Sequence, residues 1–69
     1  MKIEDPSIYF DKKLRIFSKA GGITEGELYG YDYDFDDDDN EYLEFDVELS
    51  SGMLIGFTED EIERIEIIK

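Results

Sequence analysis

The sequence contains no cysteine and no histidine. Without cysteine, neither a disulfide nor a thiolate metal site can stabilise the fold. Without histidine, Ser50 and Ser51 have no base that could activate them, and the many carboxylates nominate no particular acid/base pair. A domain of 69 residues also offers no obvious substrate cleft. We therefore expect no enzymatic activity and no catalytic residues.

The sequence also lacks a long apolar run in residues 1–20, so we expect neither a signal peptide nor a transmembrane helix. The lack of cysteine fits an intracellular protein, and we expect a cytoplasmic location. Residues 1–69 should form a single domain, close to the lower size limit for independent folding. Its stability then has to come from a compact β-rich core or from oligomerisation.

Basic residues are scarce, with seven Lys and Arg against twenty Asp and Glu, for a net charge of −13. None of them lies between residues 20 and 63, where sixteen of the acidic residues are found. Such a surface repels phosphate and anionic lipid, so we expect neither nucleic acid nor a membrane as partner. Because 41% of the residues are hydrophobic, the chain should still fold.

The hydrophobic pattern predicts strands over residues 14–18, 23–35, 43–49, 53–57 and 64–68. Asp5 and Pro6 favour a short helical turn before the first strand, and residues 58–61 favour another before the last. Gly26 and Gly30 predict bends or bulges within the long second strand. The predicted fold class is all-β with a short N-terminal helical turn, as a five-stranded, strongly bent antiparallel barrel.

The strands carry two short motifs. The first has the order Gly-x-Leu-x-Gly-x-Asp and consists of Gly26, Leu28, Gly30 and Asp32. The second is partial and runs from Ile55-Gly56-Phe57 to Ile62 and Ile65. In the order of its elements and motifs, the chain resembles the Sm-like (LSm) family of SH3-like barrels over residues 5–68. The resemblance implies an SH3-like or Sm-like barrel in which the first motif and Gly56 are structural.

The residues that read RNA in that family are replaced here. RNA-binding members carry an Asn a few residues after the motif Asp, and this chain has Asp36 in that place. The Arg-Gly pair of the second motif has no Arg, because Gly56 stands between apolar residues. The replacements leave acceptors where donors and a cation are needed, so the resemblance does not extend to typical RNA binding.

Four residues of the acidic loop are candidate ligands for weak Ca²⁺ binding: Asp32, Asp34, Asp36 and Asp38. Their spacing begins like a helix-loop-helix calcium site, but the sixth position is Asp37 rather than Gly and the twelfth is Leu43 rather than Glu. The alternative is a solvated acidic edge and loop tip that discourages aggregation between strands. We expect no other cofactor.

The candidate interaction residues are aromatic, acidic or at strand edges: Tyr33, Phe35, Asp36, Asp37, Asp38, Asp39, Leu54 and Ile68. On an extended strand, the aromatic residues at 31, 33 and 35 face away from the carboxylates at 32, 34 and 36. Together with Tyr29 and Tyr42, these aromatic residues fit a core or a protein interface better than a platform for bases. Leu54 and Ile68 fall off the inward alternation and could serve pairing between the edge strands of neighbouring copies, as in Sm-like assemblies.

These expectations combine into a non-enzymatic Sm-like protein-interaction or assembly module with an acidic face. Its partner would be a protein of basic character, and a homo-oligomer could form through edge strands. Three alternatives stay open, namely an acidic mimic of nucleic acid, a divalent-cation-binding loop, and residual RNA binding as an Sm-like ring.

Overall fold

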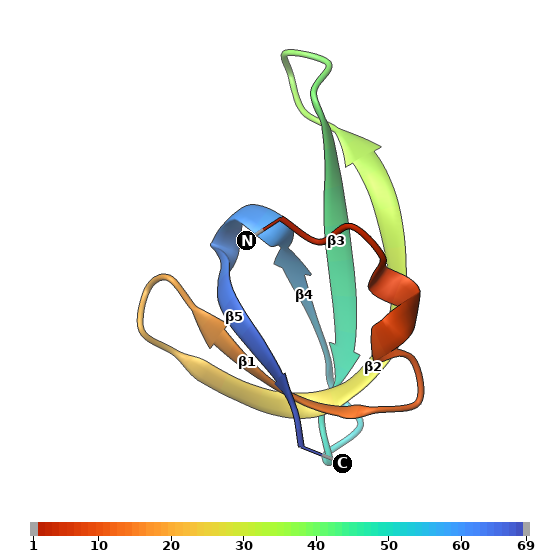
Figure 1. Cartoon of the computed structure of the whole chain (residues 1–69), viewed down its shortest axis with the longest axis vertical. Coiled ribbons are helices and arrows are strands. Elements are labelled where there is room, and N and C mark those ends of the chain that lie inside the picture. Colours follow the sequence, from red (N-terminus) through yellow and green to blue (C-terminus); the bar gives the residue numbers. More distant parts are fainter. Residues whose placement is uncertain (1, 69) are drawn as a thin grey trace.

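The computed structural model describes residues 2–68. Five strands form one antiparallel sheet in the order β4-β3-β2-β1-β5 (Figure 1). The strands are β1 (Lys13–Ser18), β2 (Ile23–Phe35), β3 (Glu41–Glu48), β4 (Leu54–Thr58) and β5 (Ile62–Ile67). Two 3-10 turns accompany them, η1 (Pro6–Tyr9) and η2 (Glu59–Glu61). The predicted all-β, five-stranded antiparallel fold is confirmed, and each strand begins and ends within two residues of its predicted bounds.

The long strand β2 pairs with two different strands along its length. Its residues 23–27 pair with β1, and its residues 27–35 pair with β3 (Figure 1). The strands β4 and β5 are the two edges, and within residues 2–68 no ladder joins them. Ile55 of β4 and Ile65 of β5 pack against the core from these edges. Side-chain packing therefore brings the two edge strands onto one core, while backbone pairing leaves them open.

A β-bulge at Tyr29 changes which residues of β2 point inward. Leu28 pairs with Val47 and Gly30 pairs with Asp46, so Tyr29 has no partner in β3. Before the bulge the even-numbered residues face the core, and after it the odd-numbered residues do. The bulge therefore moves the aspartates that follow it to the outer face of the sheet.

Glycine is needed at residue 26 because β2 and β3 approach each other closely there. A Cβ atom at this position would lie 2.5 Å from the carbonyl oxygen of Glu48 and 2.7 Å from Cγ1 of Val47. The backbones of β2 and β3 can approach this closely only where β2 carries no side chain. The close approach of β2 and β3 therefore depends on glycine at residue 26.

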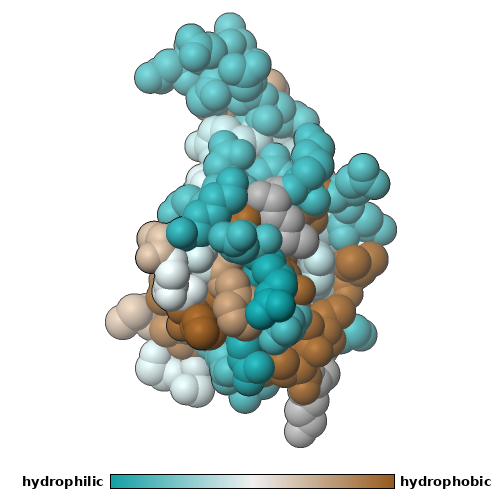
Figure 2. All heavy atoms as spheres, turned by 60° about the vertical axis from the view of Figure 1, so that its left-hand side comes forward, coloured by the Kyte–Doolittle hydropathy of each residue, from teal (hydrophilic) through white to brown (hydrophobic). Residues whose placement is uncertain are grey.

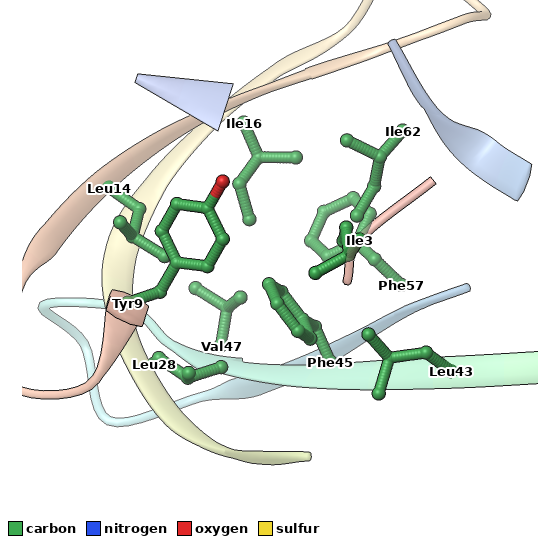
Figure 3. Packing of buried hydrophobic residues seen from close by; sticks show 10 residues of the cluster. All are labelled: Ile3, Tyr9, Leu14, Ile16, Leu28, Leu43, Phe45, Val47, Phe57 and Ile62. Atoms are coloured by element: carbon green, nitrogen blue, oxygen red, sulfur yellow. The ribbon is translucent and has the colours of Figure 1, made fainter. Parts of the chain in front are cut away.

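Among residues 2–68, the buried hydrophobic residues that form the core are Ile3, Tyr9, Leu14, Ile16, Leu28, Leu43, Phe45, Val47, Phe57 and Ile62 (Figure 3). The N-terminal segment contributes Ile3 to this cluster. The backbone N–H of Ile3 donates to the Glu59 carboxylate at 3.2 Å. Burial of each side chain of this size contributes roughly 1.5–3 kcal/mol to the stability of the fold.

Within residues 2–68, no helix has the length and apolar character needed to cross a membrane.

Candidate functional site

Charge divides the outer face of the sheet into two parts. On the part formed by β1 and β5, Arg15 lies between Glu25 and Glu66. Its Nε donates to Glu25 at 2.7 Å, and a terminal nitrogen lies 3.5 Å from Glu66. The hydrogen bond to Glu25 is the main cause that raises the pKa of Arg15. Arg64 lies 3.6 Å from Glu66 and over the ring of Phe17. Both arginines therefore neutralise nearby acids on their own part of the sheet.

Beyond the bulge at Tyr29, the outer face of β2 and β3 carries four carboxylates. We call it the acidic half, and it consists of Asp32, Asp34, Glu44 and Asp46 on β2 and β3. Asp32 lies directly opposite Glu44, so two like charges face each other across the ladder. Within residues 2–68, no ion pair forms to any of these four carboxylates. Like charges directly opposite each other destabilise a sheet. We therefore expect the carboxylates of the acidic half to lower the stability of the fold.

Two glycines leave Asp46 without side chains on either side. Gly30 of β2 and Gly56 of β4 are its direct cross-strand partners. A Cβ atom on Gly30 would meet nothing within 4 Å, and one on Gly56 would come no closer than 3.5 Å to the Asp46 carboxylate. A partner group can therefore approach the Asp46 carboxylate along the sheet surface.

Tyr42 lies within this negative field. It pairs with Asp34, and the charge of Asp34 is the main cause that raises the pKa of Tyr42. Desolvation adds to the shift, followed by the charges of Glu44 and Asp36. A negative field and partial burial both disfavour the phenolate form.

The hairpin tip, residues 36–40, folds around the carboxylate of Asp36. Oδ1 of Asp36 accepts the backbone N–H groups of Asp38 and Asn40, each at 2.9 Å. Asp39 takes a left-handed backbone conformation with φ of 61°. The Asp36 carboxylate thus has a structural use in shaping the turn.

The structure does not gather the four candidate calcium ligands. Asp32 and Asp34 lie on the outer face of β2, whereas Asp36 and Asp38 belong to the hairpin tip. In the part of the chain that the structure describes, no group of three or more acidic side chains is arranged to hold a metal ion. The described residues therefore do not form an assembled Ca²⁺ site, and Ca²⁺ binding stays a prediction.

The aromatic residues of the hairpin do not form one platform. Tyr31 is half-buried, and its ring centroid lies 5.3 Å from that of Phe10 and 6.5 Å from that of Phe45. Tyr33 meets Tyr31 edge-on at 6.3 Å. Tyr29 lies at the bulge, outside this inward-facing series.

Farther along the hairpin than Tyr31, the aromatic side chains are exposed. Tyr33 and Phe35 face the inner side of the sheet and are 51% and 61% exposed. Tyr42 is on the opposite, outer side. Hydrophilic atoms cover the projecting hairpin in Figure 2, and hydrophobic atoms gather in the lower part of the molecule. Tyr33 and Phe35 are therefore exposed aromatic groups on a hairpin that is otherwise rich in carboxylates.

The two predicted edge residues lie at opposite edges of the sheet. Leu54 pairs with Glu48 at the start of β4 and is 49% exposed. Ile68 follows β5, and its N–H donates to the carbonyl of Lys13 at 2.9 Å. This bond continues the β1–β5 pairing, and within residues 2–68 no further strand forms a ladder with β5.

Glu44 and Asp46 belong to the acidic half but are not among the site residues predicted from the sequence. The alternation with Phe45 and Val47 was the available signal. Their partners across the sheet depend on the bulge and on strand register, which the alternation alone does not contain.

No protein-family model matches the chain, and the comparisons with curated proteins and with solved structures give no match either.

Proposed function

We propose that this chain is a non-enzymatic protein-interaction module of Sm-like build whose acidic half binds a basic protein. The unequal distribution of cations over the outer face is the observation that supports this proposal. Arg15 is paired with Glu25 and Glu66, whereas within residues 2–68 no Lys or Arg forms an ion pair with the four carboxylates of the acidic half.

Repulsion within the acidic half supplies the driving force for such binding. Asp32 and Glu44 are direct cross-strand partners, so the ladder keeps their Cα atoms opposite each other. A cationic partner relieves this repulsion when it binds. Complementary potentials also speed the encounter and disfavour acidic partners.

The edge strands β4 and β5 add an assembly function to the proposal. Both edges lack a further strand within the described residues, and Leu54 is half exposed at one of them. Each added copy brings a charge of −13, so self-repulsion grows with ring size. Low salt should then weaken the assembly, because the charges are less screened. Sedimentation that finds a monomer over a whole salt series would exclude this part of the proposal.

Two variants with the same loss of charge test partner binding. In the face variant, Asp32, Asp34, Glu44 and Asp46 become their amides. In the tip variant, residues 36–39 become Asn, and each variant loses four negative charges. Cross-linked complexes from the native host are compared with those of the unchanged chain.

We expect a protein partner that is retained by the unchanged chain and the tip variant and is lost by the face variant. Equal loss in both variants would mean that only net charge matters, and it would contradict the proposal. A partner that is itself a nucleic-acid-binding protein and is displaced by its nucleic acid would identify the module as an acidic mimic. Binding of an oligonucleotide by the chain itself at moderate salt would contradict the protein-partner proposal.

A further inference from the structure

The end of β2 has a neighbouring strand on one side only. β1 pairs with β2 as far as Glu27, and an isolated bridge joins Leu28 to Phe10. Within residues 2–68, no strand pairs with β2 on that side after Leu28. Figure 1 shows this end of β2 with β3 on one side and no chain on the other. We call residues 31–35 the free edge of β2.

The ladder with β3 determines which backbone groups point to the free edge. Asp36 N–H donates to the Asn40 carbonyl at 3.0 Å, just beyond the pair formed by Phe35 and Glu41. Phe35 and Glu41 are therefore a non-hydrogen-bonded pair, whose own N–H and C=O groups point away from the partner strand. The register runs without interruption through residues 31–35, so the odd-numbered residues all direct these groups away from β3.

One of these groups is covered by a local bond. The N–H of Phe35 donates to Oδ1 of its neighbour Asp34 at 2.8 Å. Within residues 2–68, no neighbouring strand accepts a hydrogen bond from this N–H. A carbonyl group of an added strand can replace the Asp34 carboxylate at this N–H.

Side chains along the free edge alternate between two chemistries. Asp32 and Asp34 lie on the outer side, and Tyr33 and Phe35 lie half exposed on the inner side. An added strand places its alternate side chains next to these two rows. The complementary strand therefore alternates Lys or Arg with apolar residues.

We infer that the free edge of β2 binds an extended segment of a basic protein by β-strand addition. The basic side chains of the segment lie beside Asp32 and Asp34, and its apolar side chains lie beside Tyr33 and Phe35. This inference rests on the proposed function and adds the conformation and the sequence pattern of the partner.

Charge opposes a second copy of this chain at the same edge. An antiparallel pairing centred on Tyr33 would place Asp32 of each copy opposite Asp34 of the other. Like charges directly opposite each other destabilise a ladder, and each copy also carries a net charge of −13. A basic segment meets neither penalty, which favours it over self-pairing as the occupant.

Two peptides of identical composition test this inference. The first, KVKYKVK, alternates lysine with Val or Tyr, and the second, KKKKVYV, has the same residues without alternation. Both are blocked at their ends and are added at equal concentration to the isotope-labelled protein. Amide hydrogen exchange and NMR shifts are measured for residues 31–35.

The alternating peptide should slow exchange of the Tyr33 amide by about tenfold or more at saturation, because that N–H becomes part of a ladder. The second peptide should shift the acidic residues without protecting this amide. If both peptides bind without protecting it, the strand-addition inference is wrong, whereas binding by the acidic half stands. If neither peptide binds, both proposals are wrong. Protection that grows with protein concentration alone would assign the edge to a second copy.

Variants sharpen the assignment. Tyr33→Pro removes an outward N–H and leaves the β2–β3 hydrogen bonds in place, so we expect a folded protein in which the alternating peptide no longer slows exchange of the remaining outward amides, those of Tyr31 and Phe35. Asp32→Asn with Asp34→Asn should abolish the preference for the alternating peptide. Its control, Asp37→Asn with Asp38→Asn, removes the same charge and should keep that preference. A folded Tyr33→Pro variant or a doubly neutralised edge that still prefers the alternating peptide would overturn the inference.

Discussion

Tyr42 lies directly opposite Asp34 on the outer face of the β2–β3 hairpin, and the Asp34 carboxylate is the main cause of its raised pKa. The phenol therefore responds to the unneutralised charge of the acidic half. The pKa of Tyr42 is higher in the folded chain than in the unfolded chain. Its contribution to the free energy of unfolding is therefore complete below the unfolded pKa and is lost as pH rises through the folded pKa.

Replacing Asp34 should lower the pKa of Tyr42. Asp34→Asn removes the largest cause of the shift, whereas Asp38→Asn removes an equal charge from the hairpin tip. Site-resolved NMR titration of the labelled tyrosine rings measures the pKa in each variant. We expect a clear fall for Asp34→Asn and little change for Asp38→Asn. Equal falls would show that net charge, and not the facing carboxylate, sets this pKa.

Neutralising Asp32 should stabilise the fold. Asp32→Asn removes repulsion from Glu44, and we expect the free energy of unfolding to rise by about 0.5 kcal/mol at low salt. Added salt should reduce the gain, since it screens exposed charges. Glu25 lies on β2 like Asp32, but it is paired with Arg15. Glu25→Gln should therefore lower the free energy of unfolding slightly or leave it unchanged. Urea unfolding of both variants provides the measurement, and a loss of stability in Asp32→Asn at low salt would contradict the expected repulsion.

The two glycines of β2 should differ in their tolerance of alanine. In Gly26→Ala, the new Cβ would lie 2.5 Å from the Glu48 carbonyl oxygen, so we expect a loss of roughly 1–3 kcal/mol of stability. In Gly30→Ala, the new Cβ meets nothing within 4 Å, and the change should be neutral or stabilising. Thermal and urea unfolding compare the two variants directly. Equal losses would mean that the close approach of β2 and β3 does not determine the need for glycine.

Acid should weaken the turn at η2. The Glu61 carboxylate accepts the N–H of Thr58 at 3.1 Å and its hydroxyl at 3.0 Å, and these bonds, the N–H first, lower the pKa of Glu61. The contribution to stability is therefore complete above the ordinary value of 4.5 and is lost as pH falls through the lower, folded value.

The difference in stability between the unchanged chain and Glu61→Gln should shrink from neutral to acidic pH. Glu63→Gln, at an exposed residue of β5, is the control and should show no such convergence. Urea unfolding at several pH values measures both differences. A difference for Glu61→Gln that does not depend on pH would show that the charge of Glu61 is not involved.

Local sequence patterns were sufficient to predict the strands. The alternation of Leu43, Phe45 and Val47 predicts a strand with one buried side, and all three residues are buried in β3. Asp5 and Pro6 predict a helical start, and the structure forms η1 there, with the Asp5 carboxylate accepting the N–H of Ser7. These features depend on residues close together in the chain, so a pattern of a few residues contains them.

The remaining features depend on residues far apart in sequence. Ile3 is buried because the chain returns at η2, and its N–H reaches Glu59, 56 residues later. Arg15 is neutralised by Glu25 and Glu66 only because β1 lies between β2 and β5. The acidic half likewise follows from strand register and from the bulge at Tyr29. No local pattern determines these pairings.

Binding of a cation-rich chain by the acidic half is tested most directly by titrating the labelled protein with penta-arginine, which keeps its charge at the pH where tyrosine titrates, and observing the side-chain carboxylate carbons by NMR. We expect the largest shifts at Asp32, Asp34, Glu44 and Asp46, together with a fall in the pKa of Tyr42 as arginine charges offset the carboxylates around it. Shifts of equal size at every acidic residue, including Glu25, with no change in the pKa of Tyr42, would contradict the assignment of the acidic half as the binding surface.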